Sequence, residues 1–174
     1  MTKIFIRQSA MFILLVSLQV CILSRVHIFH IATPVIYSYF LIKLPVRLNR
    51  NIVLLLGMLI GLAVDLFGHT FGYTIGTNML AAVTVAFARF RLAGLFKPRD
   101  VTENVIPSFV TFGRSMFLRY SASVMLLHII LLSVIDAGAS FVPSTLFLRI
   151  AGCFAVSYPI MYGMEMIYCG KTER

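Results

Sequence analysis

The chain has 174 residues, of which 60% are hydrophobic and 12% are charged. A soluble domain carries about twice that share of charged residues, and a chain of this length could not bury so much apolar surface in water, so the composition predicts a membrane protein. The net charge is +9, but the basic residues form no patch large enough to follow a phosphate backbone, which argues against nucleic-acid binding.

Six apolar stretches follow one another along the chain, and each is predicted to be a membrane-spanning helix of a single integral domain, residues 1–174. The predicted spans are 9–23, 26–44, 51–67, 73–90, 116–135 and 146–168. Crossing the hydrocarbon core takes about 20 helical residues, so the first and third spans are short for that length. Lys3 and Arg7 resemble the start of a signal peptide, but no cleavage site follows promptly, and we expect a retained span. The predicted fold is an all-α, polytopic membrane helical bundle with about six transmembrane helices.

The basic residues gather in alternate joints between the predicted spans. If the N-terminus is cytoplasmic, thirteen of the fifteen lysines and arginines fall on the inner side, and two, Arg25 and Arg149, fall on the outer side. Cytoplasmic loops of membrane proteins are enriched in lysine and arginine. The pattern therefore predicts that both termini are cytoplasmic.

The longest predicted loop covers about residues 91–115 on the cytoplasmic side. Pro98 ends a helix there, and apolar residues then recur at helical spacing: Val105, Phe109, Phe112 and Met116. These features predict an amphipathic segment in the membrane interface, beside anionic lipid headgroups. Docking of a cytoplasmic partner is the alternative. Four basic residues are predicted to contact lipid or the cytoplasm: Arg47, Arg50, Lys97 and Arg99.

The third predicted span presents Gly57, Gly61 and Asp65 on one helix face, because they are four residues apart. Glycines at this spacing let a neighbouring helix approach closely. Asp65 is placed to accept hydrogen bonds from free N–H groups at the start of the next span. A proton or ligand site and a contact with a partner helix are the alternatives for this carboxylate. The next span is the most polar one, and its Asn78 is expected to face another helix.

Other polar residues predict structural roles. We expect a neighbouring helix to satisfy His128, and an ion pair between Asp136 and Arg149 to join the last two spans. His27 and His30 have metal-ligand spacing, but no third ligand is near, so no metal site is predicted. The three cysteines include no CxxC pair, and their odd number suggests neither a zinc site nor a disulfide framework.

Catalytic signatures such as a Gly-x-Ser-x-Gly elbow, a P-loop or HExxH are missing from the sequence. We therefore predict no catalytic residue and no cofactor, and we do not expect an enzyme.

Several motifs follow one another in a characteristic order. Pro34 precedes the stretch 37–45 (YSYFLIKLP), which is followed by Arg47 and Arg50. Next come the stretch 57–67 (GMLIGLAVDLF), with its Gly-Leu-x-x-Asp motif, and later Phe71-Gly72. This order resembles that of the bacterial rod shape-determining MreD family, over about residues 19–165.

The resemblance implies a non-enzymatic, multi-pass subunit of the bacterial inner membrane, within the cell-elongation machinery. Such a subunit scaffolds MreC and, through it, connects MreB with RodA and its transpeptidase partner. The resemblance also implies a helical fold similar to the substrate-binding subunits of energy-coupling-factor transporters. Candidate helix-packing or partner-binding residues are Pro34, Gly57, Gly61, Asp65, Gly72 and Asn78.

Two other functions remain open at this point. A solute-binding membrane subunit of a transporter would need a polar pocket, lined by Thr74, Asn78 and Asp65. A lipid-processing enzyme is the weaker alternative, because clustered acidic residues are missing.

Overall fold

The computed structural model describes residues 2–25, 33–68, 76–98, 105–137 and 143–172, and these ranges contain helices, turns and loops but no strand. The elements, in chain order, are α1 (Thr2–Cys21), η1 (Leu23–Arg25), α2 (Ser38–Ile42), α3 (Arg50–Phe67), α4 (Thr77–Phe96), α5 (Phe109–Phe112), α6 (Arg114–Ala137) and α7 (Pro143–Thr172).

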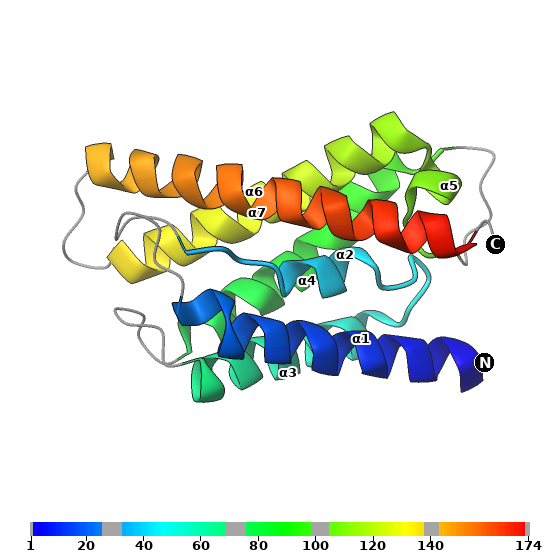
Figure 1. The fold of residues 1–174 in the computed structure, drawn as a ribbon, viewed down its shortest axis with the longest axis horizontal. Coiled ribbons are helices and arrows are strands. Elements are labelled where there is room, and N and C mark those ends of the chain that lie inside the picture. The colour runs from blue at the N-terminus through cyan, green and yellow to red at the C-terminus, as the bar shows by residue number, and fades with distance from the viewer. Residues whose placement is uncertain (1, 26–32, 69–75, 99–104, 138–142, 173–174) are drawn as a thin grey trace.

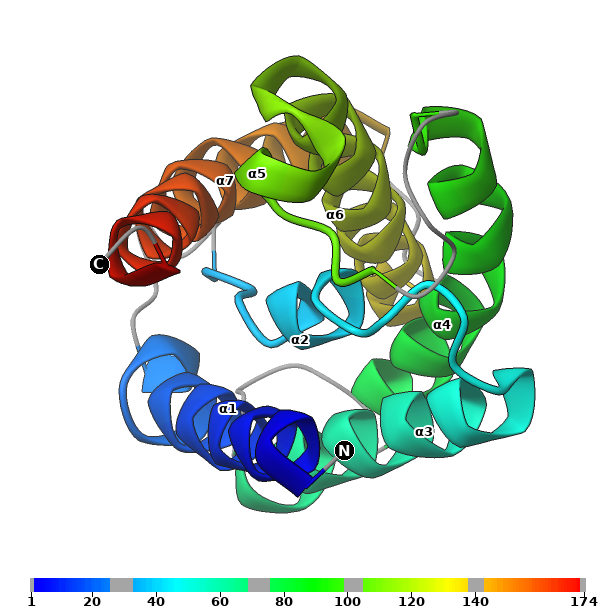
Figure 2. The same ribbon diagram turned by 90° about the vertical axis from the view of Figure 1, so that its right-hand side faces the viewer.

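The long helices α1, α3, α4, α6 and α7 form a ring around the short helix α2 (Figure 2). They lie lengthwise along the molecule, and the two chain termini lie at the same end of the bundle (Figure 1). The closest neighbours in the ring are α3 and α4, which are consecutive in the chain. The same-end placement of the termini is the arrangement that the charge pattern predicts.

Among the residues that the structure describes, four helices are long and apolar enough to cross a membrane: α3, α4, α6 and the part Pro143–Cys169 of α7. Helix α1 has a shorter apolar part, Ile6–Cys21. The chain is therefore compatible with a multi-pass membrane protein. The predicted spans agree with these helices within a few residues, except that α4 continues six residues beyond residue 90, to Phe96, and α1 begins already at Thr2.

The second predicted span, 26–44, differs from the structure. Residues 26–32 lie outside the described part, and the described remainder is helical only over Ser38–Ile42. Pro34 contributes to this difference, because proline has no N–H to donate and disfavours helical geometry in the residue before it. The prediction of a continuous helix is wrong here, and the count of six spans stays a prediction.

The predicted amphipathic loop, 91–115, also differs. Its first six residues continue α4, and Arg99 belongs to the part that is not described. Ser108 caps α5, which has only four residues, and Phe112 is buried. Val46 N donates a hydrogen bond to Val105 O at 3.0 Å. The described residues 105–112 thus pack onto the end of the bundle. Apolar residues at helical spacing occur both in segments that pack against protein and in segments that lie in lipid, so the sequence pattern does not distinguish the two.

Candidate functional site

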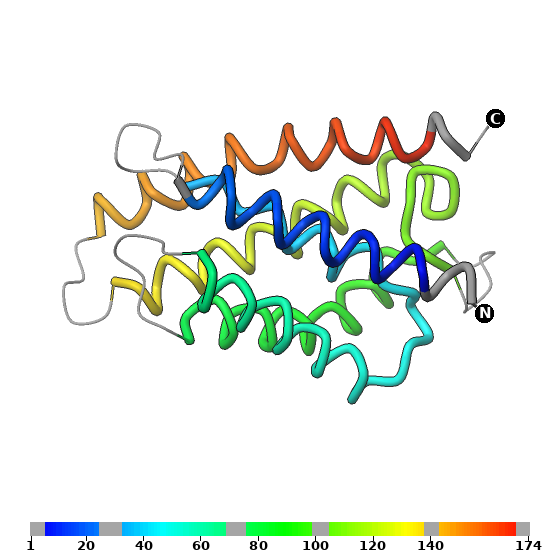
Figure 3. The backbone as a smooth tube through the Cα atoms, turned by 60° about the horizontal axis from the view of Figure 1, so that its bottom comes forward, coloured from blue at the N-terminus to red at the C-terminus, as the bar shows by residue number. Residues whose placement is uncertain are grey.

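The most unusual feature of the interior is the stretch of residues 33–45, here called the central segment. Each of its residues is buried, and it runs lengthwise through the ring of long helices (Figures 1 and 3). Its first part is not helical, so its N–H and C=O groups need partners other than their own helical neighbours. In a membrane protein such a backbone is stable only where the surrounding protein supplies those partners.

Two side chains from different helices supply partners for the non-helical part. Gln19 of α1 donates from Nε2 to Pro34 O (3.0 Å) and accepts at Oε1 from Ile36 N (2.9 Å). Ser157 of α7 accepts at Oγ from Val35 N (2.8 Å). A side-chain amide thus takes the place of a neighbouring backbone strand. We infer that Gln19 and Ser157 fix the path of this part.

The other end of the central segment is held by its carbonyl oxygens. Gln8 Nε2 donates to Lys43 O at 3.1 Å. Arg89 of α4 donates from Nη2 to Leu44 O (2.7 Å) and to Pro45 O (3.2 Å), and its side chain is fully buried. The charge pattern places Lys43 and Arg89 on the cytoplasmic side, next to the ends of predicted spans 26–44 and 73–90. Both instead point into the bundle.

Asp65 binds the first turn of α4. Its Oδ1 accepts from Asn78 N (3.2 Å) and Asn78 Nδ2 (2.9 Å), and its Oδ2 accepts from Met79 N (2.9 Å). Gly76, with φ of 98°, turns the chain into the helix, and this left-handed geometry favours glycine. The expectation that Asp65 accepts hydrogen bonds from the start of the following span is confirmed. A carboxylate here also faces the positive end of the helix dipole.

The hydrogen bonds continue from Asp65 to the middle of the bundle. Tyr37 Oη donates to Asn78 Oδ1 (2.9 Å), and His128 Nε2 lies 2.7 Å from Tyr37 Oη. Because Tyr37 uses its only proton toward Asn78, His128 must donate from Nε2. The bonds therefore all point toward Asp65: His128 donates to Tyr37, Tyr37 donates to Asn78, and Asn78 donates to the Asp65 carboxylate. The expectation that a neighbouring helix satisfies His128 is met only in part: the partner of Nε2 is Tyr37, which precedes α2 in the central segment, and the buried Nδ1 has no hydrogen-bond partner among the described residues.

A second buried network surrounds Glu165 of α7. Lys43 Nζ lies 2.9 and 3.1 Å from the two carboxylate oxygens, and Tyr39 Oη donates to Oε2 at 2.6 Å. Phe109 N donates to Oε1 at 3.2 Å, and Lys43 Nζ also donates to Pro107 O at 2.9 Å. Neither charged side chain of the pair is more than 1% exposed. One ion pair thus connects the central segment, α7 and the segment that leads into α5.

This second network was not predicted from the sequence, although a signal was present. Glu165 is a carboxylate within a predicted span, and such residues are functional or structural candidates by default. Lys43 lies within the predicted span 26–44, next to its end, where a basic side chain is expected to reach the cytoplasmic side.

The glycine face of α3 is covered by α4 of the same chain. A Cβ atom built on Gly61 would lie 2.5 Å from Met79 Cα, and one on Gly57 would lie 2.9 Å from Ala86 Cβ. Only glycine permits such a close approach of two helices. The predicted close contact is confirmed. Its partner helix is internal, so this face is not open to another protein.

The remaining predicted residues have varied positions. Asp136 and Arg149 form the expected ion pair between α6 and α7. Arg47 and Arg50 are exposed, and Lys97 is half-buried. Gly72, Thr74, His27, His30 and Arg99 lie outside the described residues. Within the described ranges, no three histidine, cysteine or acidic side chains are close enough together to hold a metal ion.

The chain was compared with models of protein families, with curated proteins and with solved structures, and none of them matches it.

Proposed function

We propose that this chain is a non-enzymatic scaffold subunit of the bacterial inner membrane, of the MreD type, in the machinery of lateral cell-wall synthesis. One observation carries the proposal: the motif residues of the resemblance are used to build the bundle. Asp65 is bonded to the start of α4, Gly61 lies against α4, and Tyr37 and Lys43 anchor the central segment. Groups that are bonded to one another in this way support a rigid framework better than they support catalysis.

A scaffold of this kind interacts through its outside. The outer face of α7 carries exposed apolar residues, among them Phe147 and Ile167, which suit neighbouring helices of MreC or RodA. The exposed Arg47 and Arg50 follow the central segment and begin α3, at the end where the termini lie (Figure 1). This end is the proposed cytoplasmic side, nearest to MreB.

The cellular test is depletion of the protein in a rod-shaped host, followed by microscopy and by complementation. Cells should become round on depletion and regain their shape with the wild-type chain. Rods that persist after complete depletion would contradict the proposal.

A biochemical test uses the close contact of α3 and α4. Gly61→Leu should disturb the framework and reduce the recovery of MreC in co-purification. Gly94→Leu is the matched control, since a Cβ at Gly94 meets nothing within 4 Å. Equal recovery of MreC with both variants would show that partner binding does not depend on this contact.

The alternative is a solute-binding membrane subunit of a transporter. It would place Asp65 and Asn78 in a polar pocket, whereas their side chains are hydrogen-bonded to each other at 2.9 Å, and Asn78 is also bonded to Tyr37. A panel of small water-soluble vitamins should therefore leave the Tm of the purified protein unchanged. A saturable rise in Tm with one of them would favour the transporter function.

A further inference from the structure

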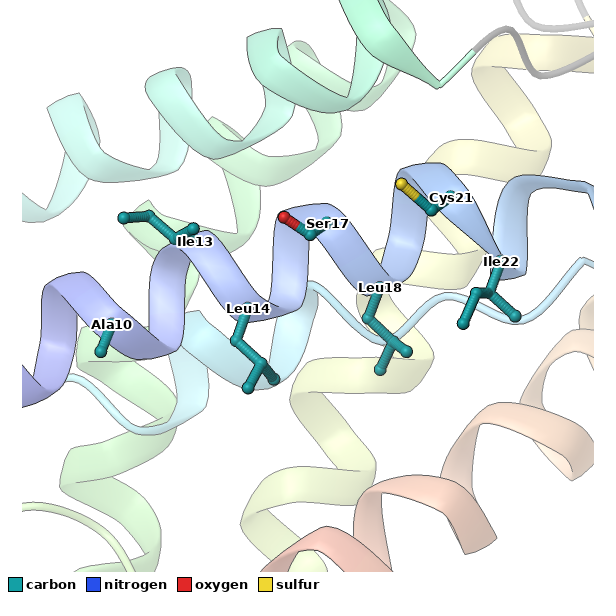
Figure 4. Close-up of a pocket in the computed structure, with 7 residues that line it drawn as sticks. All are labelled: Ala10, Ile13, Leu14, Ser17, Leu18, Cys21 and Ile22. Atoms are coloured by element: carbon teal, nitrogen blue, oxygen red, sulfur yellow. The ribbon is translucent and has the colours of Figure 1, made fainter.

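Helix α1 carries an open groove on its outer side, which extends from Ala10 to Ile22 (Figure 4). The small side chains of Ala10, Ser17 and Cys21 leave room between larger aliphatic ones, and the exposed wall is apolar. An apolar groove of this kind suits an aliphatic chain.

The length of the groove corresponds to one leaflet of a bilayer. At a rise of 1.5 Å per residue, Ala10 and Ile22 are about 18 Å apart along the helix. The hydrocarbon core is about 30 Å thick, so one leaflet contributes about 15 Å. The groove begins at Ala10, one helical turn after Arg7, and ends just past the last residue of α1 (Thr2–Cys21). With Arg7 among the headgroups, an acyl chain along the groove extends from that side to about the middle of the bilayer.

An exposed cation lies in line with the groove. Arg7 is one helical turn before Ala10, and Arg7 and Leu14 are seven residues apart, on nearly the same face of α1. Its guanidinium carbon is 5.3 Å from the ring centroid of Tyr168 in α7. A guanidinium stacked on a ring still presents N–H groups at its edge, in a geometry that matches phosphate. The carboxylates of Glu165 and Asp136 are paired with Lys43 and Arg149, and neither of them forms an ion pair with Arg7.

We propose that Arg7 and the α1 groove together bind one anionic phospholipid from the leaflet at the N-terminal end of α1. The phosphate group contacts Arg7 beside Tyr168, and an acyl chain occupies the groove toward Ile22. The terminal cation favours this occupant over a transmembrane helix, which needs no anion at this point. The site is independent of the scaffold function proposed above.

The test uses tryptophan fluorescence, because the chain has no tryptophan of its own. Ile13→Trp places the single fluorophore in the groove. Leu59→Trp is the matched control: Leu59 is exposed on α3 and lies nine residues, about 14 Å along the helix, from Arg50. Each variant is reconstituted into phosphatidylcholine vesicles. One series contains increasing fractions of brominated phosphatidylglycerol and the other increasing fractions of brominated phosphatidylcholine. Brominated acyl chains quench tryptophan fluorescence on contact.

A basic residue near an anionic membrane surface contributes about 1 kcal/mol, which is roughly a fivefold preference. Brominated phosphatidylglycerol should therefore quench the Ile13→Trp variant at about one fifth of the mole fraction that brominated phosphatidylcholine requires. Adding Arg7→Gln to this variant should make the two lipids equal. The two quenching curves of the Leu59→Trp variant should lie within about twofold of each other, because no arginine of the described residues is near that position.

Three results would overturn the proposal. One is equal quenching of the Ile13→Trp variant by both lipids, and another is a preference that survives Arg7→Gln. The third is weak quenching by both lipids together with a cross-linked dimer, which would assign the groove to a helix of a second copy. Circular dichroism of each variant confirms that the helices are intact.

Discussion

The buried ion pair of Lys43 and Glu165 gives the sharpest stability prediction. Glu165→Gln keeps the shape of the side chain but removes its negative charge. Lys43 then remains in a site where it is 1% exposed, without a charged partner. Removing one partner of a buried pair costs about 3–5 kcal/mol, because the other charge is left uncompensated. A domain is stable by only about 5–15 kcal/mol, so this variant should be close to unfolding.

The double variant Lys43→Met with Glu165→Gln separates charge from packing. Methionine fills much of the space of the lysine without a charge, and the glutamine oxygen can still accept from Tyr39. We therefore expect the double variant to be more stable than Glu165→Gln alone, by about 2 kcal/mol or more. Arg149→Gln is the control at a more accessible ion pair, since Arg149 is 27% and Asp136 6% exposed, and should cost less than Glu165→Gln.

The assay is unfolding of the purified protein in mixed micelles of a mild detergent and sodium dodecyl sulfate, followed by circular dichroism. Two results would refute the reasoning. One is a Glu165→Gln variant within about 1 kcal/mol of the wild type, and the other is a double variant less stable than the single one.

Three further predictions use the same unfolding assay. Gly61→Ala should destabilise the protein by about 1–3 kcal/mol through overpacking against Met79, whereas Gly94→Ala should be neutral or slightly stabilising; equal effects would contradict the packing. Asp65→Ala should cost about 1–3 kcal/mol, because it leaves N–H groups of α4 without their acceptor; a loss below about 0.5 kcal/mol would show that these groups find other partners. Gln19→Leu should cost about 2–5 kcal/mol, because two backbone groups of the central segment lose their partner, and a neutral result would mean that the segment follows another path.

The positions of the long helices could be predicted from the sequence because apolar length is a strong signal. Span 51–67 differs from α3 by a single residue at its start. The Asp65 hydrogen bonds were predictable as well, since a carboxylate before a helix start has few other partners nearby in the chain. The close contact at Gly61 followed from the spacing of two glycines.

The central segment could not be predicted in the same way. Apolar residues are frequent both in its helical part, 38–42 (SYFLI), and in the part before it, 33–37 (TPVIY), so composition does not mark where the helix begins. The partners that stabilise the non-helical part, Gln19 and Ser157, are respectively 15 and 122 residues away from their hydrogen-bonding positions. Such distant pairings leave no local pattern. The burial of Lys43 and Arg89 could not be predicted either, because a basic residue near the end of a span has the same sequence context whether its side chain points outward or inward.

The central claim is that the central segment runs buried through a bundle whose terminal end faces the cytoplasm. Cysteine labelling in intact cells tests it directly. The native cysteines are replaced by serine, and a single cysteine is introduced at Tyr37, Phe40 or Arg47. The cells are then exposed to a membrane-permeant or an impermeant maleimide. The account predicts that the cysteines at 37 and 40 react with neither reagent and that the one at 47 reacts with the permeant reagent alone. Labelling of position 47 by the impermeant reagent, or labelling of position 40 as fast as position 47, would contradict it.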